Sequence, residues 1–153
     1  GWHYEGPGDD ANPSAPCGSM TTAGLTGLTI CQAALADYDV QRLRLVAGIE
    51  RARHAGFGWF ARHMSVRFNP GWVGRQPRWV YYYLYGLERA CVLSAVHTIN
   101  DRDWYFEGAT MLLDLQAADG SWPAEANGDD VIERTAMAVL FLKRASLPVV
   151  TGR

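Results

Sequence analysis

The stretch of sequence that decides the fold is residues 108–122, GATMLLDLQAADGSW. Its first half has the spacing of an amphipathic helix, with an apolar face formed by Leu112, Leu113 and Leu115. The helix ends near Gln116, and Asp119-Gly120 is typical of a tight turn, because glycine readily takes the positive φ that ends a helix. The stretch therefore predicts a helix and a turn that bring Gln116 close to Trp122.

This pattern resembles the QW repeat of the terpenoid cyclase and protein prenyltransferase superfamily, in which a glycine, an apolar pair, a glutamine and Gly-x-Trp recur at similar spacing. The segment 79–97, WVYYYLYGLERACVLSAVH, is similar to the C-terminal half of bacterial prenyltransferase/squalene-oxidase-repeat proteins. The opening Gly1-Trp2 resembles the tail of another QW repeat, whose glutamine would lie upstream. The resemblance implies a structural clasp between the outer helices of an α/α toroid, made by Gln116, Gly120 and Trp122.

The hydrophobic periodicity predicts five helices. They cover residues 19–36, 40–64 and 79–97, a helix that begins at 101 or 103 and ends in the QW stretch, and residues 131–146. Low-charge helices that should be buried alternate with amphipathic helices that should face solvent, as in a double-layered α/α barrel. The tyrosine run in 79–97 has strand propensity, but the length of the segment favours a helix. Ser19 and Asp130 are expected to cap the first and last helices, and the glycines at 56 and 58 to break or bend the second.

The predicted fold class is all-α, as an incomplete α/α toroid, half of an α/α barrel built from helical hairpins. Residues 1–18 are assigned to a loop that ends an upstream QW-type repeat, residues 19–147 to the five-helix half-domain, and residues 148–153 to a C-terminal tail. The resemblance implies that this is the C-terminal half of a toroid and that an N-terminal half precedes it.

The composition fits a single soluble domain. The chain has 153 residues, of which 48% are hydrophobic, so it can bury a core. A net charge of −2 without a basic run gives no reason to expect a nucleic-acid partner, and no apolar stretch is long enough to span a bilayer. The choice between cytoplasm and export stays open. Because the cysteines are odd in number and form no C-x-x-C pair, we expect Cys31 and Cys91 to be buried apolar residues and Cys17 to lie in a polar loop.

The superfamily has catalytic motifs that this sequence does not match. Squalene–hopene-type cyclases protonate an alkene with Asp-x-Asp-Asp, and the nearest stretch here, residues 127–130, reads Asn-Gly-Asp-Asp. Protein prenyltransferases bind zinc through Asp, Cys and His, but no Asp-x-Cys occurs, and Cys91 and His97 lie too far apart on one helix to share a metal. The acidic Asp-Cys-Thr-Ala-Glu motif of oxidosqualene cyclases is also missing. We therefore expect no metal and no cofactor.

Two groups of residues are candidates for a site. Asp129, Asp130 and Glu133 form an acidic cluster at a predicted helix start, either at the mouth of a cavity or, as we prefer, as helix-capping residues. The second group, on segment 79–97, is a candidate ligand cavity: Tyr82, Tyr85, Glu88 and Arg89. Aromatic faces there could stabilise carbocations, and buried charges could bind a polar ligand; packing and structural ion pairs are the alternatives that we favour.

Two functional hypotheses follow. The first is a binding or structural module without catalysis in this chain alone. The second is the C-terminal half of a terpenoid-cyclase-like or prenyltransferase-like enzyme with an aromatic-lined central cavity. Because half a toroid leaves apolar helices uncovered, the expected partner is a second copy or the N-terminal half, with an apolar small molecule as a further candidate ligand.

Overall fold

The computed structural model describes residues 1–3, 15–35, 41–71, 79–124 and 130–144, with only the backbone of residues 41–43. These ranges contain five α-helices, α1 (Gly18–Ala34), α2 (Gln41–His63), α3 (Val80–Leu93), α4 (Trp104–Leu115) and α5 (Val131–Lys143). Two isolated bridges, Trp2 with Cys17 and Ile99 with Arg102, are the only strand-like pairings in them. The prediction of an all-α fold with five helices is confirmed, and residues 79–97 hold a helix rather than a strand.

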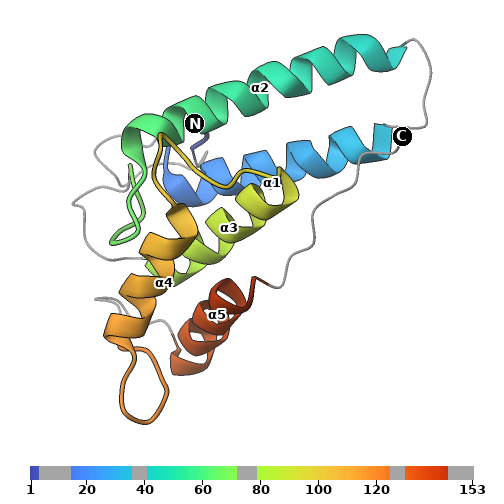
Figure 1. The fold of residues 1–153 in the computed structure, drawn as a ribbon. Helices are drawn as coiled ribbons and strands as arrows, with labels where there is room; N and C mark the ends of the chain where they lie inside the picture. The colour runs from blue at the N-terminus through green and yellow to red at the C-terminus, as the bar shows by residue number, and fades with distance from the viewer. Residues whose placement is uncertain (4–14, 36–40, 72–78, 125–129, 145–153) are drawn as a thin grey trace.

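The helices pack around α3. Figure 1 shows α1 and α2 side by side and antiparallel, with α3 below α1 and α5 below α3. The core is centred on the buried side of α3, where Tyr83, Leu84, Leu87 and Cys91 are fully covered. α4 stands at one end and contacts α5, chiefly where the ring of Phe141 stacks on Tyr105, with 5.6 Å between the ring centroids.

The α1–α3 contact is close because α3 carries a glycine at the crossing point. A Cβ on Gly86 would lie 2.4 Å from Oγ1 of Thr22. That distance is well inside a normal van der Waals contact, so any larger residue here would force the Thr22 side chain, or α1 with it, to move. Thr22 in turn donates its hydroxyl proton to the Ser19 carbonyl at 2.8 Å, which keeps its side chain against its own helix.

The start of α1 differs from the sequence prediction. Cys17, not Ser19, occupies the N-cap position, and its side chain makes no capping bond. The cap comes from Asn69, whose Oδ1 accepts the Ser19 backbone N–H at 2.9 Å while its Nδ2 donates to the Ser19 hydroxyl at 3.0 Å. Since Asn69 lies in the loop that follows α2, this contact ties α1 to the far end of the helical hairpin.

Several expectations about burial are wrong. Cys31 is exposed and Cys17 is buried, the reverse of what we expected, while Cys91 is buried as expected. α1 has an exposed side that includes Ile30, so it is not covered on most sides. α5 buries only one stripe and leaves apolar residues exposed: Val131, Ile132, Val139 and Leu140. Low charge predicted burial for these helices, but both lie at the edge of the packed helices, where one side stays uncovered.

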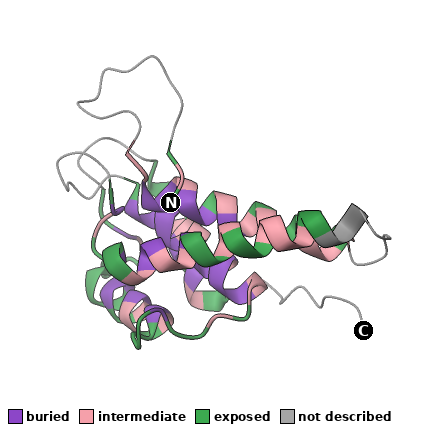
Figure 2. Ribbon diagram, turned by 90° about the horizontal axis from the view of Figure 1, so that it is seen from above, coloured by how far each residue is buried: buried purple, intermediate pink, exposed green. Residues whose placement is uncertain are grey.

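The second helix is continuous. Gly56 and Gly58 lie inside α2 and do not break it. Trp59 and Phe60 are buried near its end, whereas residues 44–50 are exposed or partly exposed. Figure 2 shows the consequence, since the first half of α2 extends beyond the part of the molecule where buried residues concentrate. No helix among the described residues is both long and apolar enough to cross a membrane.

Candidate functional site

The QW stretch folds into a turn closed by its own residues. α4 ends at Leu115, and the Gln116 amide Nε2 donates to the Gly120 carbonyl at 3.0 Å. Gly120 has a φ of +85°, which a residue with a side chain rarely adopts. Trp122 is buried, and its indole Nε1 donates to the Leu112 carbonyl at 2.8 Å.

These two bonds fix the turn against α4 itself. Leu112 is in the last turn of α4, where carbonyls lack a partner within the helix, so the Trp122 indole satisfies one of them. The Gln116 amide, which we expected to reach the ends of neighbouring helices, bonds the carbonyl of its own loop instead. A clasp between outer helices of a toroid remains a prediction.

Of the three acidic candidates, the structure describes two, and both lie at the start of α5. Asp129 lies outside the described residues. Asp130 is the N-cap of α5, and its carboxylate accepts the Ile132 N–H at 2.8 Å. Glu133 is exposed in the first turn of that helix, where a negative charge interacts favourably with the helix dipole. The observed contact is that of a helix cap, the interpretation that we preferred.

The four cavity candidates on α3 face two directions. Arg89 donates to the Tyr85 hydroxyl at 3.3 Å, and its guanidinium lies 5.6 Å from the centre of the Tyr85 ring. Tyr82, one turn before Tyr85, is exposed on the same side of the helix. Glu88 is only 1% exposed and belongs to the core. The structure thus brings together Tyr82, Tyr85 and Arg89 on a partly exposed face, and places Glu88 elsewhere.

A groove that the sequence did not predict runs along α4. Its larger part encloses about 450 Å³ between α4 and the loop that follows α2, and it is lined by Met64, Ser65, Val66, Arg67, Phe68, Arg102, Phe106, Glu107, Thr110, Met111 and Asp114. A smaller part of about 140 Å³ shares Arg67, Met111 and Asp114 with it and adds Leu115. We refer to the two parts together as the α4 groove.

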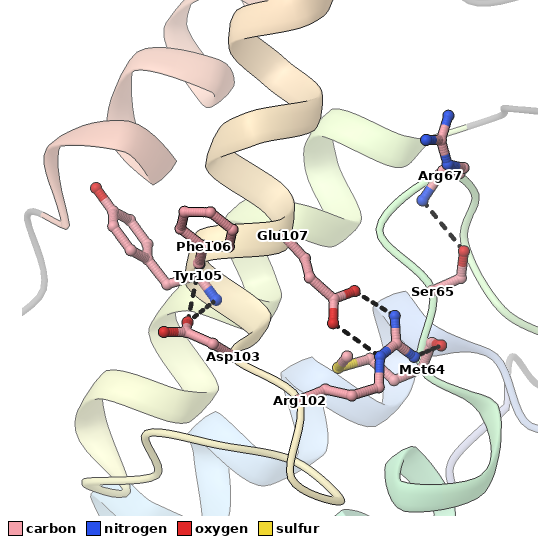
Figure 3. Close-up of polar contacts among 8 residues, drawn as sticks. All are labelled: Met64, Ser65, Arg67, Arg102, Asp103, Tyr105, Phe106 and Glu107. Atoms are coloured by element: carbon pink, nitrogen blue, oxygen red, sulfur yellow. Dashed lines mark hydrogen bonds and ion pairs between the residues drawn. The ribbon is translucent and has the colours of Figure 1, made fainter.

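One wall of the groove is held in place by Arg102 (Figure 3). Its Nε donates to Oε1 of Glu107 at 2.8 Å, and a second guanidinium nitrogen forms an ion pair with the other carboxylate oxygen. The remaining nitrogen donates to the Met64 carbonyl at 2.9 Å, which joins the first turn of α4 to the end of α2. The hydrogen bond to Glu107 raises the pKa of Arg102 above its usual value. This arginine is therefore occupied by structural contacts.

The start of α4 is fixed by local turn chemistry. Asn100 and Asp101 both have positive φ, +51° and +61°, in a tight turn closed by the bridge between Ile99 and Arg102. Asn and Asp tolerate this conformation better than other residues with side chains. Asp103 then caps the helix by accepting the backbone N–H groups of Tyr105 and Phe106 at 3.0 and 2.8 Å. The turn and the cap set where Phe106 enters the groove.

Two charged side chains of the groove are left without such contacts. Arg67 follows the buried end of α2, and Asp114 lies near the end of α4; both are exposed. Neither side chain has a hydrogen-bond or ion-pair partner among the described residues. Figure 3 shows the Arg67 guanidinium pointing away from the Arg102–Glu107 pair. The groove therefore offers one cation and one anion beside an apolar floor.

In the part of the chain that the structure describes, no group of three or more His, Cys, Asp or Glu side chains is arranged to hold a metal ion. No family model matches this sequence, and no curated protein or solved structure matches it either.

Proposed function

We propose that this chain is a helical binding or scaffolding module that covers its exposed apolar faces with a second helical unit. The observation that carries the proposal is the exposure of large apolar side chains on α4 and α5. Phe106 is 68% exposed and Ile132 is 73% exposed. Large apolar side chains exposed to this extent mark candidate interfaces in proteins.

The exposed residues follow helical spacing on both elements. Leu113 lies seven positions after Phe106 on α4, and Val139 lies seven positions after Ile132 on α5, so each pair shares one side of its helix. Burial of apolar area stabilises a complex by roughly 25 cal/mol per Å². The faces of α4 and α5 therefore favour association with a partner that presents a similar apolar surface.

The partner that we favour is another helical unit of the same kind. If the resemblance to α/α toroids holds, that unit is a second copy of the chain or an N-terminal half, and the QW-type turn of α4 is one structural unit of the assembly. The described contacts of Gln116 and Trp122 support this turn as a structural element, because they connect it to the last turn of α4.

The enzymatic alternative is the C-terminal half of a terpenoid-cyclase-like or prenyltransferase-like enzyme. Its best support is the face of Tyr82 and Tyr85, whose rings could contact an apolar ligand once a partner covers them. Turnover of squalene or a prenyl diphosphate by the purified chain, lost on Asp130→Asn without a change in melting temperature, would favour this alternative over the binding module.

The proposal is tested by sedimentation velocity over a range of protein concentrations, with binding of an apolar dye measured in parallel. We expect reversible association and dye binding that decreases as association proceeds. Phe106→Ser should reduce both signals, because it removes the most exposed apolar side chain of α4. Ile30→Ser on α1, 47% exposed, is the matched control and should leave both unchanged. A monomer at all concentrations that binds no dye would refute the proposal.

A further inference from the structure

The α4 groove has two charged side chains that its own residues leave unpaired. Arg67 belongs to the loop wall and Asp114 to the helix wall, and both border each part of the groove. The other two charged residues there, Arg102 and Glu107, neutralise each other. A partner that presents a carboxylate toward Arg67 and a cation toward Asp114 is therefore complementary in charge to the groove.

A second copy of this chain presents both a carboxylate and a cation on this surface. In a two-fold symmetric interface every contact occurs twice, since each copy uses the same surface. Arg67 of one copy then meets Asp114 of the other, and the reciprocal pair forms beside it near the two-fold axis, because both residues border the smaller part of the groove. Charge complementarity of the groove with itself thus selects a second copy over an unrelated partner.

The apolar part of the groove has the residues that such an interface needs. Phe106 and Leu115, which line the groove, are 68% and 44% exposed. Thr110, one turn after Phe106, is an exposed small residue in the middle of α4. A small side chain there lets a second helix approach closely, beside the larger apolar groups Phe106 and Leu115.

We infer that two copies of this chain associate through their α4 grooves about a two-fold axis, joined by two reciprocal Arg67–Asp114 ion pairs and by burial of Phe106 and Leu115 from each copy. The inference rests on the proposed function, which requires association, and adds the surface and the occupant. Because Arg67 and Asp114 are exposed, their ion pairs set orientation and register more than they set affinity.

Charge reversal tests the inference. In sedimentation equilibrium, Arg67→Glu alone and Asp114→Arg alone should each raise the dimer Kd about tenfold or more, because two like-charge contacts replace two ion pairs. An equimolar mixture of the two variants should associate as tightly as the unaltered chain, since each substituted position then faces an opposite charge. Added salt should weaken the unaltered dimer. Circular dichroism confirms that the variants remain folded, as expected for exposed positions.

A double variant and a control variant separate ion pairs between two chains from ion pairs within one chain. The double variant Arg67→Glu/Asp114→Arg, with both substitutions in one chain, should dimerise as tightly as the unaltered chain. If the two side chains pair only within one chain, the double variant dimerises but the mixture of single variants does not, and that result overturns the inference.

Arg44→Glu is the control variant. It reverses an exposed charge in the first turn of α2, at the far end of the molecule, and should leave Kd unchanged (Figure 1). A dimer indifferent to both reversals refutes the inference and leaves the proposed function intact. A monomer that binds the apolar dye also refutes the inference and leaves the proposed function intact. A monomer that binds no dye refutes the inference and the proposed function together.

Discussion

At the level of single residues, the three cysteines differ sharply in environment. Cys31 is exposed on the outer side of α1, while Cys17 and Cys91 are buried. Burial raises the pKa of the Cys91 thiol, and the nearby Glu88 raises it further. A raised thiol pKa reduces the thiolate that reacts with electrophiles, so burial and charge act in the same direction.

We therefore expect Cys31 to be alkylated first when the native protein is treated with iodoacetamide. Cys91 should react only as fast as the protein unfolds, and Cys17 should also be protected. The measurement is mass spectrometry of peptides after short labelling times, with urea-unfolded protein as the control in which all three thiols react. Equal labelling rates for Cys31 and Cys91 in the native state would show that the α3 core is open.

Trp122 is the residue that anchors the turn after α4. Trp122→Ala removes a buried ring and its hydrogen bond to Leu112, so it should lower the free energy of unfolding by roughly 3–5 kcal/mol. Trp122→Phe keeps most of the apolar volume and should cost clearly less. Urea denaturation followed by circular dichroism measures both. A loss below about 1 kcal/mol for the alanine variant, the size typical of surface changes, would argue against a role as anchor.

At the level of secondary-structure elements, the contact between α1 and α3 depends on the absence of a side chain at Gly86. Gly86→Ala should destabilise the protein by about 1–3 kcal/mol, the usual cost of overpacking, because its Cβ would meet Thr22. Gly27→Ala is the matched control on α1, where no atom lies within 4 Å of the added Cβ. That change should instead stabilise α1 by about 0.5–1 kcal/mol, through helix propensity. Thermal unfolding of both variants measures the difference in sign, and two changes of the same sign would contradict the geometry of the crossing.

The elements themselves could be predicted because their signals are local. Apolar periodicity identified the helices, and the side chains of Asp103 and Asp130 lie directly before the amide groups that they cap. The cap of α1 could not be read in this way, since Asn69 is 50 residues from Ser19 and only the packed hairpin brings them together. Exposure of Cys31 was missed for a related reason, because low charge does not tell which side of a helix is left uncovered.

The α4 groove could not be predicted from the sequence for the same reason, because its residues come together only in the folded chain. Its two walls come from the loop after α2 and from α4, which are far apart in the sequence. Arg102 and Glu107 are five residues apart and straddle the helix start, so the ion pair does not match the i,i+4 spacing that marks charge pairs on helices. The dipeptide Asn100-Asp101 was the one local signal available, because both residues favour the positive φ that this turn requires.

At the level of the whole molecule, stability should be distributed unevenly. α3 contacts both α1 and α5, and its inner side chains are fully covered, whereas the first half of α2 extends beyond the part of the molecule where buried residues concentrate (Figure 2). Regions with few buried contacts open locally at low free energy, while the central core opens only when the protein unfolds globally. The same helix, α2, thus combines a loosely held beginning with an end that carries Trp59 and Phe60 into the core.

Native-state hydrogen exchange makes this distribution measurable. Amides of residues 84–91 in α3 should exchange slowest, at the rate set by global unfolding, because the inner side of this helix packs against both α1 and α5. Amides of residues 44–50 should exchange by local fraying, faster by several orders of magnitude, even though they belong to a continuous helix. Adding a low urea concentration should speed exchange in α3 and leave residues 44–50 almost unchanged, since only global unfolding exposes much new surface. Equal protection and equal urea dependence in both segments would mean that α2 is covered along its whole length, which in a self-associating chain would move the interface from α4 to α2.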